Sequence, residues 1–155
     1  KNLKNDIMQV DEVDGFSMLI NKHNFKDDQY FDENFFLYLE NNDLCLKVKK
    51  MGSKIYIIKN SIIDHKGSSS SDDHFSNEIE YLKNWHWMWS KFYFNKKHYG
   101  YFYSFLRISG NLFSAAAKFI MYFLLNNRKK YFYKARLSGC INGLMLKKSW
   151  YRAKI

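Results

Sequence analysis

Large apolar residues repeat at helical spacing through the second half of the chain. A stripe with gaps of three or four residues runs through the segment 76–94: Ile79, Leu82, Trp85, Trp89 and Phe92. This spacing places the side chains on one face of a helix. The pattern from Tyr99 onward predicts two more helices, over about 101–125 and 129–146, with a break at two consecutive asparagines, 126 and 127.

The first half carries shorter apolar segments. Residues 1–12 are polar, and we expect an entry loop or a frayed end there. Val13–Ile20 predicts a strand, because apolar residues alternate along it, and Gly15 permits a bend or a close approach of another backbone. Lys54–Lys59 predicts a second short strand, and the segment 61–65 is a candidate for a third.

Between these strands, "FFLYLENNDLCLKVKKMG" (35–52) predicts a helix through three apolar residues at positions i, i+4 and i+7: Leu44, Val48 and Met51. Asn41 or Asn42 suits the N-cap, and Asp43 in the first turn complements the helix dipole. Gly52 suits the position just past the C-terminus. Asp43 therefore has a structural explanation, whereas Glu40 would lie just before the cap, where its side chain can face a cleft.

Composition and charge indicate what kind of partner the chain binds. The 155 residues are 46% hydrophobic, enough for one domain with a core or for part of a larger one. All 15 acidic residues lie within 1–80, while 81–155 hold 15 lysines and arginines, no acidic residue and all four tryptophans. A basic, aromatic half indicates an anionic partner, either a membrane surface or nucleic acid. Cys45 and Cys140 form no disulfide or metal pattern, which fits a reducing cytoplasm.

Two features of this basic half bear on membranes and sugars. The most apolar run, "LFSAAAKFIMYFLL", has fourteen residues including Lys118, whereas a bilayer span needs roughly 20. A helix lying in the membrane interface and a helix packed on the parent domain both fit it.

Alternate residues of a helix cannot all face one way. We therefore expect Trp85 and Trp89 in the core and Trp87 exposed, where it could stack on a sugar or face lipid.

The order of motifs resembles the C-terminal half of a family-2 glycosyltransferase with a GT-A fold, of the rhamnosyltransferase-like kind. The matching stretches are "VDGFSMLI", "FDENFFLYLENNDLCLKVKKMG", and "IIDHKGSSSS", followed by a helix rich in Trp and Lys. The resemblance covers roughly residues 10–100. It implies an α/β fold, with a partial GT-A (Rossmann-like) sheet, flanking helices and a helical C-terminal tail. It also implies an acceptor-side domain over 1–100 and a basic amphipathic tail over 101–155, without the nucleotide-binding half.

The resemblance also implies site residues. An inverting transferase needs a carboxylate that removes a proton from the acceptor hydroxyl, and a Mg²⁺ or Mn²⁺ ion that neutralises the departing nucleotide diphosphate. The family's acidic pair is Glu40-Asn41 here, so either Glu40 is the base, or Asp43 is, or the activity is altered or lost. We favour Glu40, with Asp43 in support, and His65 as the metal ligand or diphosphate contact.

The expected function is therefore transfer of a sugar from a nucleotide-sugar donor to a saccharide or lipid-linked acceptor, in bacterial surface polysaccharide synthesis. Gly15, Asn41 and Trp87 are the expected acceptor or donor contacts. The basic tail would hold the enzyme, as a peripheral protein, on the cytoplasmic face of the cell membrane. The alternative is a non-enzymatic basic and aromatic module that binds nucleic acid or an anionic membrane; no known nucleic-acid motif supports it.

Overall fold

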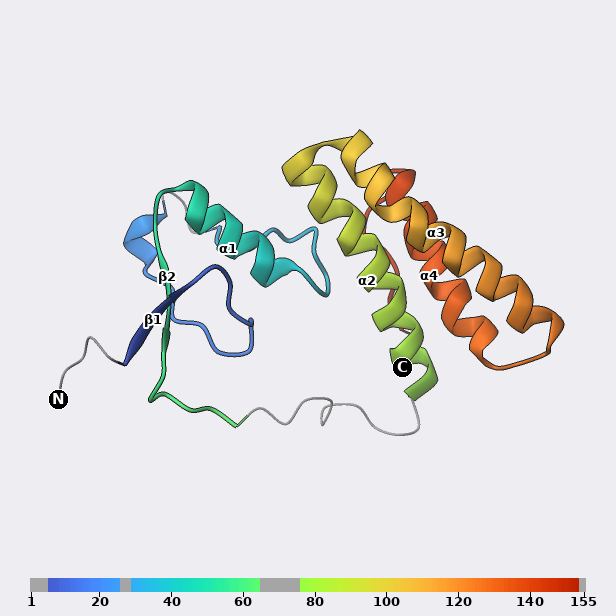
Figure 1. The fold of residues 1–155 in the computed structure, drawn as a ribbon, viewed down its shortest axis with the longest axis horizontal. Helices are drawn as coiled ribbons and strands as arrows, with labels where there is room; N and C mark the ends of the chain where they lie inside the picture. Colours follow the sequence, from blue (N-terminus) through green and yellow to red (C-terminus); the bar gives the residue numbers. More distant parts are fainter. Residues whose placement is uncertain (1–5, 26–28, 65–75, 154–155) are drawn as a thin grey trace. The chain divides into compact units, whose positions relative to one another are not determined.

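The computed structural model describes residues 6–25, 29–64 and 76–153. It is a mixed α/β structure that is mostly helical, with a small antiparallel sheet (Figure 1). The chain forms two compact units: Lys1–Glu33 with Leu39–Ser68, and Asn34–Tyr38 with Ser69–Ile155. The boundary expected after residue 100 falls inside the second of these units.

The sheet of the first unit pairs two strands that lie far apart in the sequence. β1 (Ile7–Val10) runs antiparallel to β2 (Ile55–Ile58), with Ile7 opposite Ile58 and Val10 opposite Ile55. β-branched residues favour this pleated conformation. The strand predicted at Lys54–Lys59 is confirmed in β2, whereas β1 lies in a segment expected to be a loop or a frayed end.

The strand predicted at Val13–Ile20 is wrong, since these residues form turns and irregular backbone. The carbonyl of Val13 accepts a hydrogen bond from the side chain of Asn41 (3.0 Å). Alternation predicts a strand only where a partner strand and a core face are available, and here Phe16 is 52% exposed. Residues 61–64 of the candidate third strand are also irregular.

Helix α1 spans Glu40–Lys50, so it begins one or two residues before the expected N-cap. Leu39 occupies the cap position in a left-handed conformation, and no side chain caps the helix. The predicted end is confirmed: Gly52 has a φ of +76°, its amide bonds to the Lys49 carbonyl, and the Ser53 amide bonds to Val48. Only glycine adopts this conformation without steric cost.

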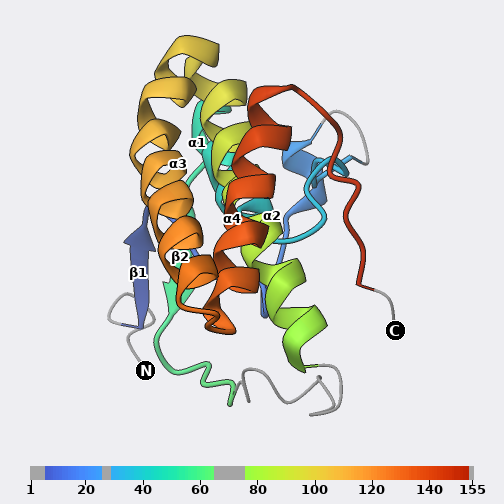
Figure 2. The same cartoon turned by 90° about the vertical axis from the view of Figure 1, so that its right-hand side faces the viewer.

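The second unit is built on α2 (Ser76–Tyr99), α3 (Tyr101–Leu124) and α4 (Lys129–Leu144), close to the predicted ranges. Figures 1 and 2 show the three helices packed side by side. Gly100, with a φ of +88°, separates α2 from α3. None of the helices that the structure describes is both long enough and apolar enough to cross a membrane.

Large side chains of α2 pack against small residues of α4. Trp85, Trp89 and Phe92 of the predicted stripe are at most 3% exposed, whereas Trp87 is 38% exposed, which confirms the assignment of core and surface tryptophans. Trp85 and Trp89 pack with Ala135 in one buried cluster. A second cluster has four buried members: Met88, Phe92, Ile108 and Cys140. Burial raises the pKa of the Cys140 thiol to about 12, so this cysteine acts as a packing residue.

Two segments outside the helices are held on α2. Leu37 accepts a hydrogen bond from Ser90 Oγ (2.8 Å), and Phe35 is 7% exposed. The segment after α4 is anchored through Lys147, whose carbonyl accepts a hydrogen bond from Trp89 Nε1 (2.9 Å). These bonds satisfy polar groups at the bundle surface, and so attach both segments to the second unit.

His86 also holds the C-terminal segment and should make its attachment sensitive to pH. The buried ring donates from Nε2 to the Tyr151 carbonyl (2.9 Å), so Nδ1 accepts from Ser149 Oγ (3.1 Å). Burial lowers the pKa of His86 from 6.5, with the Arg152 charge adding to the effect. The unfolded chain therefore binds a proton more readily, and the stability present above pH 6.5 should be lost as the pH falls below it.

The measurement is chemical unfolding of the wild type and of His86→Gln between neutral pH and pH 5. The free energy of unfolding of the wild type should fall more steeply in this window than that of the variant. Equal slopes would contradict the role assigned to His86.

Candidate functional site

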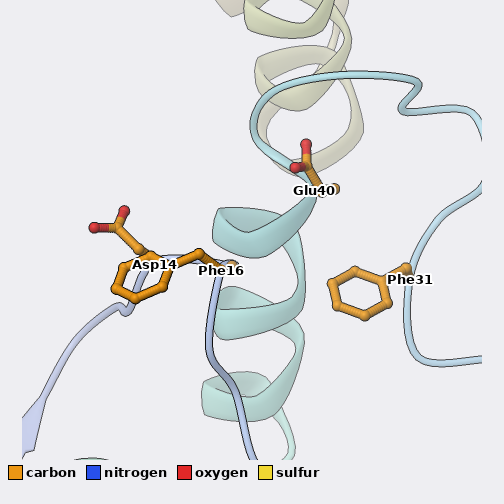
Figure 3. Close-up of a pocket in the computed structure, with 5 residues that line it drawn as sticks. Asp14, Phe16, Phe31 and Glu40 are labelled. Atoms are coloured by element: carbon orange, nitrogen blue, oxygen red, sulfur yellow. The ribbon is translucent and has the colours of Figure 1, made fainter. Parts of the chain in front are cut away.

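One cavity of about 600 Å³ in the first unit is lined by residues from three separate segments: Asp14, Gly15, Phe16, Phe31 and Glu40. Figure 3 shows Glu40 at the first turn of α1 and the Phe31 ring extending toward that helix from its own loop. Asp14 and Phe16 come from the loop that follows β1, and the Asp14 carboxylate points away from Phe31. The cavity thus combines two aromatic rings, a glycine backbone and two carboxylates.

Glu40 is the chemically distinctive residue of this cavity. Its Oε2 atom is buried, and within the described parts of the chain no group hydrogen-bonds to it. A buried carboxylate oxygen without a donor costs free energy relative to one in water. Its position in the first turn of α1 offsets part of this cost through the helix dipole.

The backbone before Glu40 is strained. Tyr38 and Leu39 have φ angles of 69° and 68°, in the left-handed region that large side chains rarely adopt. Each such residue costs on the order of 1–2 kcal/mol. The two residues turn the chain sharply into α1 and so determine where the Glu40 side chain begins. Strain of this kind is concentrated at functional sites.

Side chains of α1 hold the opposing loop in place. Asn41 Nδ2 donates to the Val13 carbonyl (3.0 Å), and Asn42 Nδ2 donates to Glu12 Oε2 (2.7 Å). A Cβ added to Gly15 would lie 3.4 Å from Asn41 Cβ, so the loop lies in van der Waals contact with the side chain of Asn41 there. The cavity wall formed by Gly15 and Phe16 is therefore positioned by α1 itself.

Lys49 and Asp11 form an ion pair that also ties this loop to α1. A hydrogen bond from Lys49 and its charge lower the pKa of the Asp11 carboxyl. Because the pair is solvent-exposed, it guides the path of the loop more than it stabilises the fold.

The structure brings Glu40 and Gly15 together, but not every residue assigned from the sequence. Asp43 is 2% exposed, and the cavity lining does not include it. Asn41 is the hydrogen-bond donor to the loop described above. Trp87 lies in the second unit, edge-on to Tyr38 at 5.4 Å between ring centroids. His65 lies outside the described residues.

Three lining residues were missed by the sequence analysis: Asp14, Phe16 and Phe31. All three occur within the motifs that carry the family resemblance, "VDGFSMLI" and "FDENFF". Phe16 lies in the segment expected to be a strand, and it is 52% exposed; Phe31 is 39% exposed. Exposed aromatic rings beside a cavity offer apolar surfaces to a ligand.

Across the residues with defined positions, no three His, Cys, Asp or Glu side chains are grouped so that they could hold a metal ion. The cavity lining offers two carboxylates and two exposed aromatic rings. Neither a protein-family model, nor a curated protein, nor a solved structure matches this chain.

Proposed function

We propose that this chain is the acceptor-side part of an inverting glycosyltransferase of the family-2, GT-A type. The observation that carries the proposal is Glu40, whose buried Oε2 has no hydrogen-bond partner among the described residues and which lines a cavity with two aromatic rings. The position of Glu40 is supported by the family resemblance as well. The β1–β2 pair would then be part of a larger GT-A sheet, and α1 would be one of the helices that flank it.

The proposed reaction combines the residues of this cavity with the chemistry that the family resemblance implies. The sugar ring of the acceptor would lie against the rings of Phe16 and Phe31, and one of its hydroxyl groups would donate to the Glu40 carboxylate. As the hydroxyl oxygen forms its bond to the anomeric carbon of the donor sugar, the bond to the diphosphate oxygen breaks. The proton of the hydroxyl passes to Glu40.

Asn41 has an amide where the family has the second acid. It cannot accept the proton, and its hydrogen bond to Val13 gives it a positioning role instead. Asp43 supports the first turn of α1 from a buried position. The resemblance implies a Mg²⁺ or Mn²⁺ ion, which would neutralise the leaving diphosphate when bound. The described residues form no site for this ion. The group of this chain that takes part in the proposed proton transfer is Glu40.

We place the reaction at the cytoplasmic face of a membrane, with a saccharide or a lipid-linked saccharide as acceptor. A carboxylate base and aromatic walls suit any sugar hydroxyl and do not distinguish one donor sugar from another. The donor sugar therefore has to be found by screening.

The test is Glu40→Gln in the complete enzyme, supplied with a panel of UDP- and dTDP-sugars and a lipid-linked saccharide. Glutamine keeps the shape of the side chain but cannot take the proton, so kcat should fall by about 10²- to 10⁴-fold with little change in the acceptor KM. Release of nucleoside diphosphate measures the turnover.

Asp14→Asn is the matched control, because it removes a carboxylate from the same cavity without removing the proposed base. Its turnover should remain near that of the wild type. Unchanged turnover in Glu40→Gln, with loss in Asp14→Asn, would exclude Glu40 as the base.

A further inference from the structure

Large apolar side chains lie exposed along the outer face of α3 in the part of the chain that the structure describes. Five large side chains are 56–77% exposed: Phe102, Leu106, Phe113, Ile120 and Leu124. At about 100° per residue they fall within an arc of about 40°, and they extend over about 33 Å of helix. The buried residues Ser104, Ile108 and Ala115 occupy the other side of the helix. An exposed apolar strip of this size marks an interaction surface.

Basic residues lie on one flank of α3, about 120–140° around the helix from the centre of this strip, and continue beyond its end as a basic border. Arg107 and Lys118 are exposed on α3, and Arg128, Lys129 and Lys130 follow immediately. The ammonium group of Lys118 lies 5.5 Å from the Tyr133 ring centroid, and that of Lys129 lies 5.8 Å from the Tyr122 centroid. In both contacts the charged group itself lies over the ring, so these two cations are held against aromatic side chains of α3 and α4. The sequence from 81 to 155 contains no acidic residue that could neutralise them.

We propose that the outer face of α3 binds the surface of a bilayer containing anionic phospholipids, with the helix lying in the plane of the interface. The apolar strip would enter the boundary between headgroups and acyl chains, and the basic border would contact the phosphates. This inference goes beyond sugar transfer, because it concerns attachment and depends on α3 and its neighbouring cations alone.

Charge favours lipid over the other possible occupants. A second copy of the chain docked on α3 would bring two basic borders together with no acidic residue of α3 or α4 between them. Nucleic acid would contact the basic border through its phosphates but would leave the Phe and Leu strip in water. An anionic bilayer is the partner that uses both features at once.

The experiment is flotation of the full chain with vesicles of phosphatidylcholine and of phosphatidylcholine mixed with phosphatidylglycerol. The chain should bind the anionic vesicles and bind the neutral ones much more weakly. The double variant Phe113→Ser with Leu124→Ser should lose at least about tenfold in affinity. Arg107→Gln and Lys118→Gln should each lose about fivefold.

The matched control is Leu19→Ser with Ile62→Ser, two apolar side chains that are 101% and 89% exposed but belong to the first unit. This variant should bind like the wild type. Equal loss in both double variants, or equal binding to neutral and anionic vesicles, would overturn the proposal. A chain that is dimeric in solution and becomes monomeric only in Phe113→Ser with Leu124→Ser would assign the face to a second copy instead. Transfer activity is not measured, so failure here would leave the proposed reaction untouched.

Discussion

Replacing Gly139 with alanine should cost at least about 3 kcal/mol of the free energy of unfolding. A Cβ at this position of α4 would lie 2.3 Å from the Trp85 carbonyl oxygen and 3.2 Å from Met88 Cβ, both on α2. The carbonyl belongs to the backbone of α2, so no rotation of a side chain can relieve the contact. The helices would have to separate, which disturbs the packing of the buried tryptophans; overpacking a core costs about 1–3 kcal/mol, and more where a backbone must move.

Gly110→Ala is the matched control for this experiment. Gly110 lies on α3 with no atom within 4 Å of an added Cβ. Alanine should therefore raise the stability by about 0.5–1 kcal/mol through its helix propensity. Denaturant unfolding followed by far-UV circular dichroism would measure both variants. A Gly139→Ala protein as stable as the wild type would show that α2 and α4 do not approach this closely.

Gly143→Ala should give an intermediate result in the same measurement. Its Cβ would meet three side-chain atoms of Phe92 at 3.1–3.2 Å, and a side chain can shift by a few tenths of an ångström. The order Gly110, Gly143, Gly139, from gain to largest loss, follows from what each Cβ would touch.

Trp85→Ala should be the most destabilising substitution of a large side chain, at about 3–5 kcal/mol. Trp85 is fully buried, and its Nε1 donates to Ser138 Oγ (3.0 Å) on α4. Its removal would leave a cavity between α2 and α4 and would take away the donor to Ser138 Oγ. Thermal unfolding of the variant beside the wild type would report the loss.

Trp87→Ala is the control with the same change of side chain on the same helix. Trp87 is 38% exposed and makes an edge-on contact with Tyr38, so its removal should cost on the order of 1 kcal/mol. Equal losses in the two variants would contradict the separation of core and surface tryptophans. A folded Trp87→Ala protein also allows the expected sugar or lipid contact of Trp87 to be measured directly.

The sequence predicted the cavity only in part, for a physical reason. Glu40 and Gly15 were assigned separately, and the structure places them in one cavity. The walls formed by Phe16 and Phe31 depend on the path of two loops, which α1 holds through hydrogen bonds from Asn41 and Asn42 to the first loop and from Lys47 to the Gln29 carbonyl of the second. Such bonds leave no periodic pattern in the sequence. Asn41 illustrates this, because its side chain was expected to cap the helix or contact a ligand, and it supports the loop instead.

The sequence by itself determined α2, α3 and α4, the exposure of Trp87 and the basic character of the second half. These features follow from contacts within a few residues, because the helical repeat places residues three and four apart on one face. Only the tertiary structure decided the pairing of β1 with β2, the close contact of Gly139 with Trp85, and the buried position of Glu40 Oε2. Each of these depends on a partner distant in the chain or on a strained backbone turn, and local spacing carries no information about either.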